Sequence, residues 1–239
     1  MNILALDTSN KAMSVAVVQD GTPLAETTLN RMKTHSEQLL PTIDNLISLS
    51  GLQPEEIDRV VVAAGPGSYT GLRIGVTTAK TFAYTMNIEL VGVSSLAVLA
   101  ANVRREAGLI VPMMDARREN VFTGIYQWDN HELVNVLLDR HTSVTQIVAE
   151  VAALNQPAVF VGTTPAMREQ IRAQLGSQAR FTDAVDDLPR ATRVAELGQS
   201  LPAADVDAFV PNYLRLTEAE TNWLKNHDGT DRSHYVEKV

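Results

Sequence analysis

Residues 60–75 read VVVAAGPGSYTGLRIG, an apolar run that leads into a glycine-rich turn. Residues 70–84, after the turn, have the apolar spacing of a helix. A strand, a glycine turn and a helix N-terminus together favour an anion site, because unpaired backbone N–H groups and the helix dipole point at the same place.

The turn matches neither of the two common phosphate-binding motifs. No Lys-Ser/Thr pair follows a glycine, as a P-loop requires, and Gly71 comes one residue later than the third glycine of the dinucleotide fingerprint. A tight strand-to-helix turn without a ligand therefore explains this segment as well as an anion site does.

The order of predicted elements around this turn occurs twice in the chain. Each half begins with a strand that ends in an aspartate, Asp7 or Asp115, and continues through two strands, a helix, a strand, a glycine turn and a helix. The predicted strands cover residues 3–7, 14–18, 23–29, 60–64, 109–115, 121–127, 132–138 and 158–161. The predicted helices cover residues 34–51, 70–84, 95–107, 145–154, 166–175 and 191–201. Pro41 is expected to kink the first helix or to delay its start.

This repeat predicts an α/β protein with a duplicated actin-like (ASKHA, RNase H-like) fold, in which two mixed-sheet lobes with helices face each other across a cleft. A generic α/β domain is the alternative, since such proteins alternate strands and helices anyway. We assign residues 1–107 to the first lobe, 108–205 to the second, and 206–239 to an extended segment and mobile tail. The helix at 191–201 is expected to pack back onto the first lobe.

The composition excludes several kinds of site. The 239 residues include no cysteine, so disulfides, thiolate zinc sites and cysteine nucleophiles are excluded. The formal net charge is −8 with scattered basic residues, whereas a protein that grips nucleic acid by itself normally has a basic face. The chain has no apolar run of membrane-spanning length and no basic start, so we expect a cytoplasmic protein that does not bind a membrane.

The predicted cleft brings together the loop after the first strand and the glycine turn. Asp7 could hold a metal-bound water, and Thr8 and Ser9 could donate to a phosphate. Alternatively, Asp7 caps its own loop by accepting backbone N–H groups. The candidate residues for this nucleotide or phosphate cleft are Asp7, Thr8, Ser9, Gly65, Gly67, Ser68, Thr70 and Gly71. Asp115 is equivalent to Asp7 in the repeat, but Arg117 and Arg118 in its loop could pair with it.

The five histidines form no His-x-x-x-His pair, and no glutamate accompanies one at metalloprotease spacing. No glycine-flanked serine of the nucleophile-elbow type occurs, and Ser68 has no histidine near it in sequence. The sequence therefore gives little support to a hydrolase.

Several segments together resemble the bacterial TsaB (YeaZ) family. These segments are ILALDTS at 3–9, HSEQLLP at 35–41, GPGSYTGLRIG at 65–75, VGVSSL at 91–96, DAR at 115–117 and YLR at 213–215. The resemblance covers nearly the whole chain. It implies an actin-like subunit that works with the catalytic subunit TsaD and the ATPase TsaE to make N6-threonylcarbamoyladenosine in tRNA.

The resemblance also implies that this chain is not itself catalytic. TsaD binds a metal through a His-x-x-x-His pair after the strand that follows the glycine-turn helix, whereas residues 93–101 here read VSSLAVLAA. No cofactor is therefore expected apart from weak ATP or ADP binding in the cleft, and tRNA is expected to be met only through the complex.

The resemblance further implies that the helices at 35–50 and 70–84 form a surface shared with a TsaD-like subunit or with a second copy in a homodimer. The residues assigned to this surface are His35, Glu37, Leu39, Leu40, Ile43, Ile47, Arg73 and Thr77. The apolar stripe that contains Leu39 has core packing as its alternative.

Two other functions are weighed against the subunit role. A nucleotide phosphotransferase of the same architecture would use the glycine turn and Asp7. A metallopeptidase would need a metal site that the sequence does not show.

Overall fold

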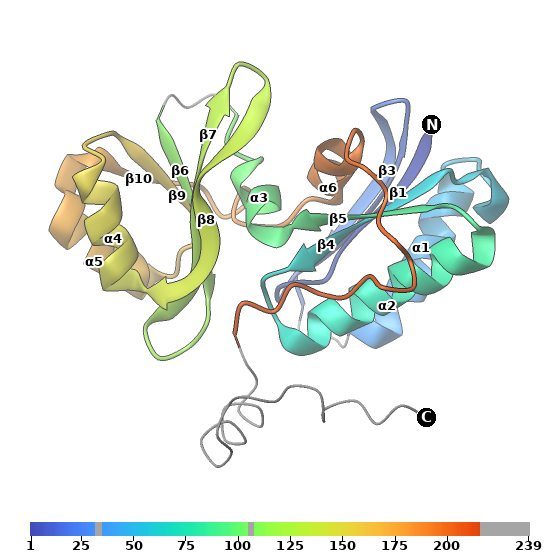
Figure 1. Cartoon of the computed structure of the whole chain (residues 1–239), viewed down its shortest axis with the longest axis horizontal. Helices are drawn as coiled ribbons and strands as arrows, with labels where there is room; N and C mark the ends of the chain where they lie inside the picture. The colour runs from blue at the N-terminus through green and yellow to red at the C-terminus, as the bar shows by residue number, and fades with distance from the viewer. Residues whose placement is uncertain (32–34, 105–107, 216–239) are drawn as a thin grey trace, which may run out of the picture.

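The computed structural model describes residues 1–31, 35–104 and 108–215, which form two lobes (Figure 1). The first lobe contains β1 (Asn2–Asp7), β2 (Met13–Gln19), β3 (Thr22–Leu29), α1 (His35–Leu49), the 3-10 turn η1 (Pro54–Glu56), β4 (Arg59–Gly65), α2 (Tyr69–Met86) and β5 (Glu89–Ser94). A short helix, α3 (Ser95–Ala100), leads to the second lobe. That lobe contains β6 (Leu109–Asp115), β7 (Asn120–Asp129), β8 (Glu132–Ser143), α4 (Val144–Ala153), β9 (Ala158–Val161), α5 (Pro165–Leu175), η2 (Gly176–Gln178) and β10 (Ala179–Phe181), and α6 (Ala191–Gly198) follows it.

The two sheets have the same topology. The first has the order β3-β2-β1-β4-β5, and the second, read in the equivalent direction, has the order β8-β7-β6-β9-β10. In each sheet the first three strands pair antiparallel and the last two join in parallel, as expected when crossovers pass through helices. The predicted duplicated actin-like α/β fold is therefore confirmed.

Each sheet is apolar on both faces, which is why its strands read as nearly continuous hydrophobic runs. Along β1, Leu4 and Leu6 face α1 and α2, whereas Ile3 and Ala5 face α6, since successive side chains alternate between the two faces. In the second lobe, α4 and α5 cover one face of the sheet and α3 packs against the other.

Helix α3 is the joint between the lobes. Its Val98 packs in the core of the first sheet, whereas Leu96 and Leu99 pack against the second. The polar contacts beside it also join the lobes, because Ser94 Oγ and Tyr126 Oη both donate hydrogen bonds to the Asp139 carboxylate. Burial raises the pKa of Asp139 above its ordinary value.

Helix α6 returns to the first lobe, as expected from the sequence, although it follows the second lobe in the chain. The buried side chain of Arg59 holds the end of α6 by donating to the carbonyls of Gly198, Gln199 and Leu201 at 2.9, 2.9 and 3.0 Å. Its Nε donates to Glu89 at 2.7 Å. The division at residue 205 stays a prediction, but α6 packs with the first sheet rather than the second.

Several expected elements differ from the structure. Pro41 lies inside α1, which begins at His35, so the expectation of a later start is wrong, whereas a kink at Pro41 stays a prediction. The helix buries the stripe of Leu39, Ile43, Leu46 and Ile47 against the sheet, and this packing offsets the lost backbone hydrogen bond. The connecting helix expected over 95–107 ends at Ala100. Strands β5 and β10 were not among the predicted elements. Residue 34, where the first helix was expected to begin, and all of the tail from residue 216 onward lie outside the described residues.

A membrane span needs a longer and more apolar helix than any in the described part of the chain.

Candidate functional site in the cleft between the lobes

The loop after β1 is buried at the base of the cleft. Asp7 Oδ1 accepts the backbone N–H and the hydroxyl of Ser9 at 2.8 and 2.7 Å, so Asp7 caps its own loop. Burial raises the pKa of Asp7 to about 6. Its Oδ2 is buried and has no hydrogen-bond partner among the described residues. Of the three candidate residues Asp7, Thr8 and Ser9, only Ser9 lines the cavity described below.

Two glycines let α2 pack directly on this loop. The Thr8 hydroxyl donates to Gly71 O at 2.7 Å, and a Cβ on Gly71 would collide with the backbone oxygen of Thr8. A Cβ on Gly75, one turn later, would collide with the Thr8 hydroxyl. The glycines of α2 therefore serve close packing between the helix and the loop.

Part of the hydrogen-bonding capacity of the glycine turn is used inside the protein. The Ser68 N–H donates to Ser9 O at 2.7 Å, and Ser68 Oγ caps α2 by accepting the Gly71 N–H at 3.4 Å. Gly65, at φ +121°, lies against the backbone oxygen of Asn212 where a Cβ would not fit. Gly67, Ser68 and Thr70 line the cavity, and Gly65 and Gly71 lie beneath its surface.

The second lobe presents an exposed loop to the same cleft. Asp115 Oδ1 accepts the Arg117 N–H at 2.8 Å, and Asn120 Nδ2 donates to Arg118 O at 3.0 Å. Arg117, Arg118 and Glu119 all have left-handed backbone angles, with φ of 67°, 53° and 59°. Such angles are unfavourable for side-chain-bearing residues, and three in succession are unusual.

A C-terminal strap, residues 206–215, crosses the first lobe and reaches the second. Lys80 Nζ donates to the carbonyls of Asp207 and Phe209 at 3.0 and 2.8 Å, and the Asn212 N–H donates to Ala64 O at 2.7 Å. Arg215 then donates to Ala116 O of the second lobe at 3.0 Å. The sequence predicts an extended segment here, but its place across the cleft depends on contacts distant in the chain.

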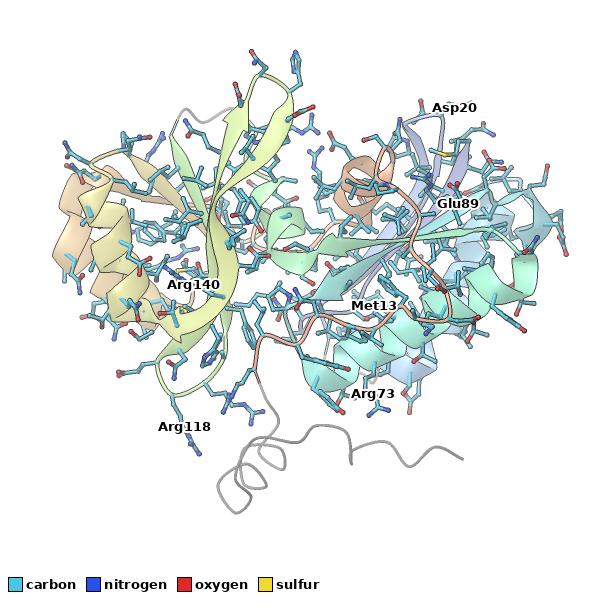
Figure 2. The ribbon with its side chains drawn as sticks, in the orientation of Figure 1. Met13, Asp20, Arg73, Glu89, Arg118 and Arg140 are labelled. Atoms are coloured by element: carbon cyan, nitrogen blue, oxygen red, sulfur yellow. The ribbon has the colours of Figure 1, made fainter. Side chains whose placement is uncertain are left out.

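The strap and the two loops enclose a cavity of about 540 Å³. Its wall comprises Ser9, Asn10, Gly67, Ser68, Tyr69, Thr70, Met114, Asp115, Ala116, Arg117, Arg118, Phe122, Tyr213, Leu214 and Arg215. The rings of Tyr69 and Tyr213 lie 5.0 Å apart between centroids. Figure 2 shows Arg118 at the lower end of the second lobe and Arg73 on the lower side of α2. The size and the mixture of aromatic, hydroxyl and guanidinium groups suit a small polar ligand.

The structure divides the residues assigned to a partner surface into two groups. Leu39, Ile43 and Ile47 are buried in the core of the first lobe, so assigning them to an interface is wrong. Their helical spacing marks the inward face of α1. The residues that reach the surface are His35, Glu37, Leu40, Arg73 and Thr77.

No group of three or more histidine, cysteine, aspartate or glutamate side chains able to hold a metal ion occurs in the described ranges. At residues 93–101, where the sequence lacks histidine, Leu96, Val98 and Leu99 are fully buried in the joint between the lobes.

Comparison with known proteins places the chain in a family. The family model described as TsaD, tRNA N6-adenosine threonylcarbamoyltransferase, matches residues 24–223. The tRNA threonylcarbamoyladenosine biosynthesis protein TsaB of Bacillus subtilis is 40% identical over 227 residues, which is 95% of this chain and 99% of that protein. The corresponding protein of Haemophilus influenzae is 29% identical over 249 residues, covering 94% and 97% of the two chains.

A solved structure gives the same result. A protein from Pseudomonas aeruginosa, described as similar to peptidase YEAZ, superposes with a TM-score of 0.79 at 26% identity. The match covers 90% of this chain and 99% of that one. The chain therefore belongs to the TsaB (YeaZ) family.

Proposed function

We propose that this chain is a non-catalytic subunit that binds a TsaD-like threonylcarbamoyltransferase and makes it competent to form N6-threonylcarbamoyladenosine in tRNA. Membership of the TsaB family over nearly the whole chain is the observation that carries this role. The packing of α3 supports the proposal that this chain is not catalytic. Buried apolar side chains fill the region that corresponds to the metal-binding histidines of TsaD.

The outer sides of α1 and α2 form the partner surface in this proposal. The two helices lie next to each other on one face of the first sheet (Figure 1). They expose large apolar side chains, among them Leu40 at 61% and Tyr84 at 73% exposed. An exposed apolar surface of this kind, with Arg73 and Thr77 on it, fits a protein partner.

The same surface would bind a second copy in a homodimer, in competition with the TsaD-like subunit. A TsaE-like ATPase would join the assembly. This chain would contact tRNA only as part of the complex, and it would act in the cytoplasm.

A reconstitution experiment tests the subunit role. Formation of threonylcarbamoyladenosine on tRNA is measured with threonylcarbamoyl-adenylate, TsaD and TsaE, while each protein is left out in turn. Product is expected only when this chain accompanies TsaD. Product from this chain alone would contradict a non-catalytic role, and product without this chain would contradict the subunit role.

Leu40→Asp tests the surface. We expect it to weaken association with TsaD at least about tenfold, as measured by titration calorimetry, because it places a charge in an apolar contact. Leu138→Asp on β8 is the matched control, since Leu138 is 78% exposed in the other lobe. Equal weakening by both variants would contradict the assignment of the surface.

We also propose that the cleft binds ATP or ADP weakly, without turnover. Ser68, Thr70, Arg117 and Arg118 supply hydroxyl and guanidinium donors along its wall. A thermal shift with ADP that Arg117→Ala reduces would support this. Steady ATP hydrolysis abolished by Asp7→Ala would instead support a phosphotransferase.

A further inference from the structure

A second cavity, separate from the cleft, gathers positive charge in this acidic protein. It measures about 880 Å³ and shares no lining residue with the cleft cavity. Its wall includes Arg104, Arg168, Arg172, Arg180 and Arg193, against two acidic residues, Asp183 and Asp186. These five are a quarter of the 20 lysines and arginines of a chain with net charge −8. We call this site the arginine cavity.

The arginine cavity is built where the second lobe meets the returning chain. Figure 1 shows the chain crossing from β10 to α6. Asn102 fixes the crossing segment, since its Nδ2 donates to the carbonyls of Asp186 and Leu188 at 2.8 and 2.9 Å. Asp187 fixes it from the other side by accepting the Gly162 N–H at 2.6 Å. Hydrogen bonds between segments distant in the chain therefore hold the wall of the arginine cavity in place.

The arginines on α5 are held by the ring of Phe181. The guanidinium carbons of Arg168 and Arg172 lie 5.4 and 4.9 Å from its centroid. Arg168 has a structural role as well, because it donates to Asp187, Thr163 and Thr182. Arg172 is exposed, one helical turn further along, and its ring contact orients the guanidinium without neutralising it.

On the α6 side, Arg193 carries an unfavourable charge. Burial and the nearby charges of Arg104 and Arg190 lower its pKa. Glu196 forms ion pairs with both Arg193, at 2.9 Å, and Arg104, and so offsets part of the repulsion between these two guanidinium groups. The Nε of Arg193 is buried and has no hydrogen-bond partner in the described ranges. An anion bound here would offset the remaining repulsion between the guanidinium groups and accept a hydrogen bond from this unpaired donor.

We propose that the arginine cavity binds a small phosphorylated ligand of the di- or triphosphate class. Guanidinium groups are suited to phosphate oxygens because they offer paired N–H donors in a planar fork. A concave site with two aspartates on its wall, in a protein of negative net charge, favours a compact phosphate group over the long backbone of a nucleic acid.

Titration calorimetry on the full chain tests the proposal, with inorganic pyrophosphate as the first probe. The variant carries both Arg172→Ala and Arg193→Ala, and the control is Arg31→Ala, at an exposed arginine of the first lobe that lines neither cavity. We expect the double variant to raise the Kd for pyrophosphate at least about tenfold, and the control to change it by less than about twofold. No binding at millimolar pyrophosphate would overturn the proposal. A greater loss in the cleft variant Arg117→Ala than in the double variant would also overturn it, because pyrophosphate would then bind in the cleft.

Two further arms keep the result interpretable. ATP and AMP are titrated in parallel with pyrophosphate. If ATP binds more tightly than pyrophosphate and the double variant weakens both to the same extent, the ligand belongs to the nucleotides. If the double variant weakens the binding of tRNA but not that of pyrophosphate, the proposal of a small-ligand site is overturned. Circular dichroism checks that each variant is folded. If the double variant unfolds, the measurement is repeated with Arg172→Glu, a single substitution at an exposed position. These readouts are independent of the tRNA-modification assay.

Discussion

The loops after β1 and β6 occupy the same place in two copies of one topology, yet they differ in almost every physical respect. Asp7 is completely buried and accepts two hydrogen bonds from Ser9, whereas Asp115 is exposed and its loop contains three left-handed residues. The difference comes from what packs on each loop. Glycines let α2 cover the first, while the second faces the cleft. Duplicated topology therefore does not imply a duplicated site.

The packing of α2 on the first loop is the feature whose loss should cost most. We expect Gly71→Val to lower the free energy of unfolding by about 4 kcal/mol, because its Cβ would collide with Thr8 O and the loop cannot yield without moving β1. Urea denaturation measures this. Thr70→Val, at an exposed neighbour in the same helical turn, is the control and should change it by less than about 0.5 kcal/mol. Similar losses in both would show that the helix does not need close approach here.

Burial of Asp7 should make stability depend on pH. Its pKa is about 6 in the folded protein against an ordinary value of 3.8, so the folded state holds the extra proton between these values. The free energy of unfolding should therefore fall by about 2.5 kcal/mol as the pH rises from about 4 to about 7, and the loss should persist above that range. Asp7→Asn should remove this dependence in urea titrations at each pH.

The control for this experiment is the equivalent aspartate of the second lobe. Asp115→Asn keeps an acceptor for the Arg117 N–H, and we expect it to change the free energy of unfolding at neutral pH by less than about 0.5 kcal/mol. An unchanged pH dependence in Asp7→Asn would contradict the assignment to Asp7.

The strap joins the two unlike loops, and cutting its contact with the second lobe should have a smaller effect. Arg215→Ala removes the hydrogen bond to Ala116 O, and we expect a loss of about 1 kcal/mol in urea denaturation. Val210→Ala, at an exposed position of the same strap, is expected to have less effect. If the two variants behaved alike, Arg215 would not be tying the strap to the second lobe.

The smallest effect should have the opposite sign. Glu119→Gly relieves a left-handed residue in the second loop, so we expect a gain of about 0.5–1 kcal/mol in thermal or urea unfolding. Gly51→Ala provides the converse case at φ +73° with open space around it, and should cost about 1 kcal/mol. A loss of stability in Glu119→Gly would mean that its side chain contributes more than its backbone costs.

Much of the fold was predictable because short stretches of sequence have the apolar spacing of the strand or helix that they form. Alternating and continuous apolar runs predicted most of the strands, and the repeat of their order indicated two copies of one topology. The short strand β10 and the early end of α3 were less visible, because three to six residues carry too little periodicity to distinguish a strand from a turn or to locate a helix end. Pro41 shows the converse case, in which tertiary packing overrides a local preference.

The sequence by itself determined the duplicated topology, the glycine turn, the lack of thiol and paired-histidine chemistry, and the family resemblance. These follow from residue types and their spacing along the chain. Only the tertiary structure decided that Asp7 lies beneath the cleft surface, that Leu39, Ile43 and Ile47 face inward, that the strap closes the cleft, and that five dispersed arginines line one cavity. Those results depend on which distant segments pack together, and spacing along the chain does not encode distance in space.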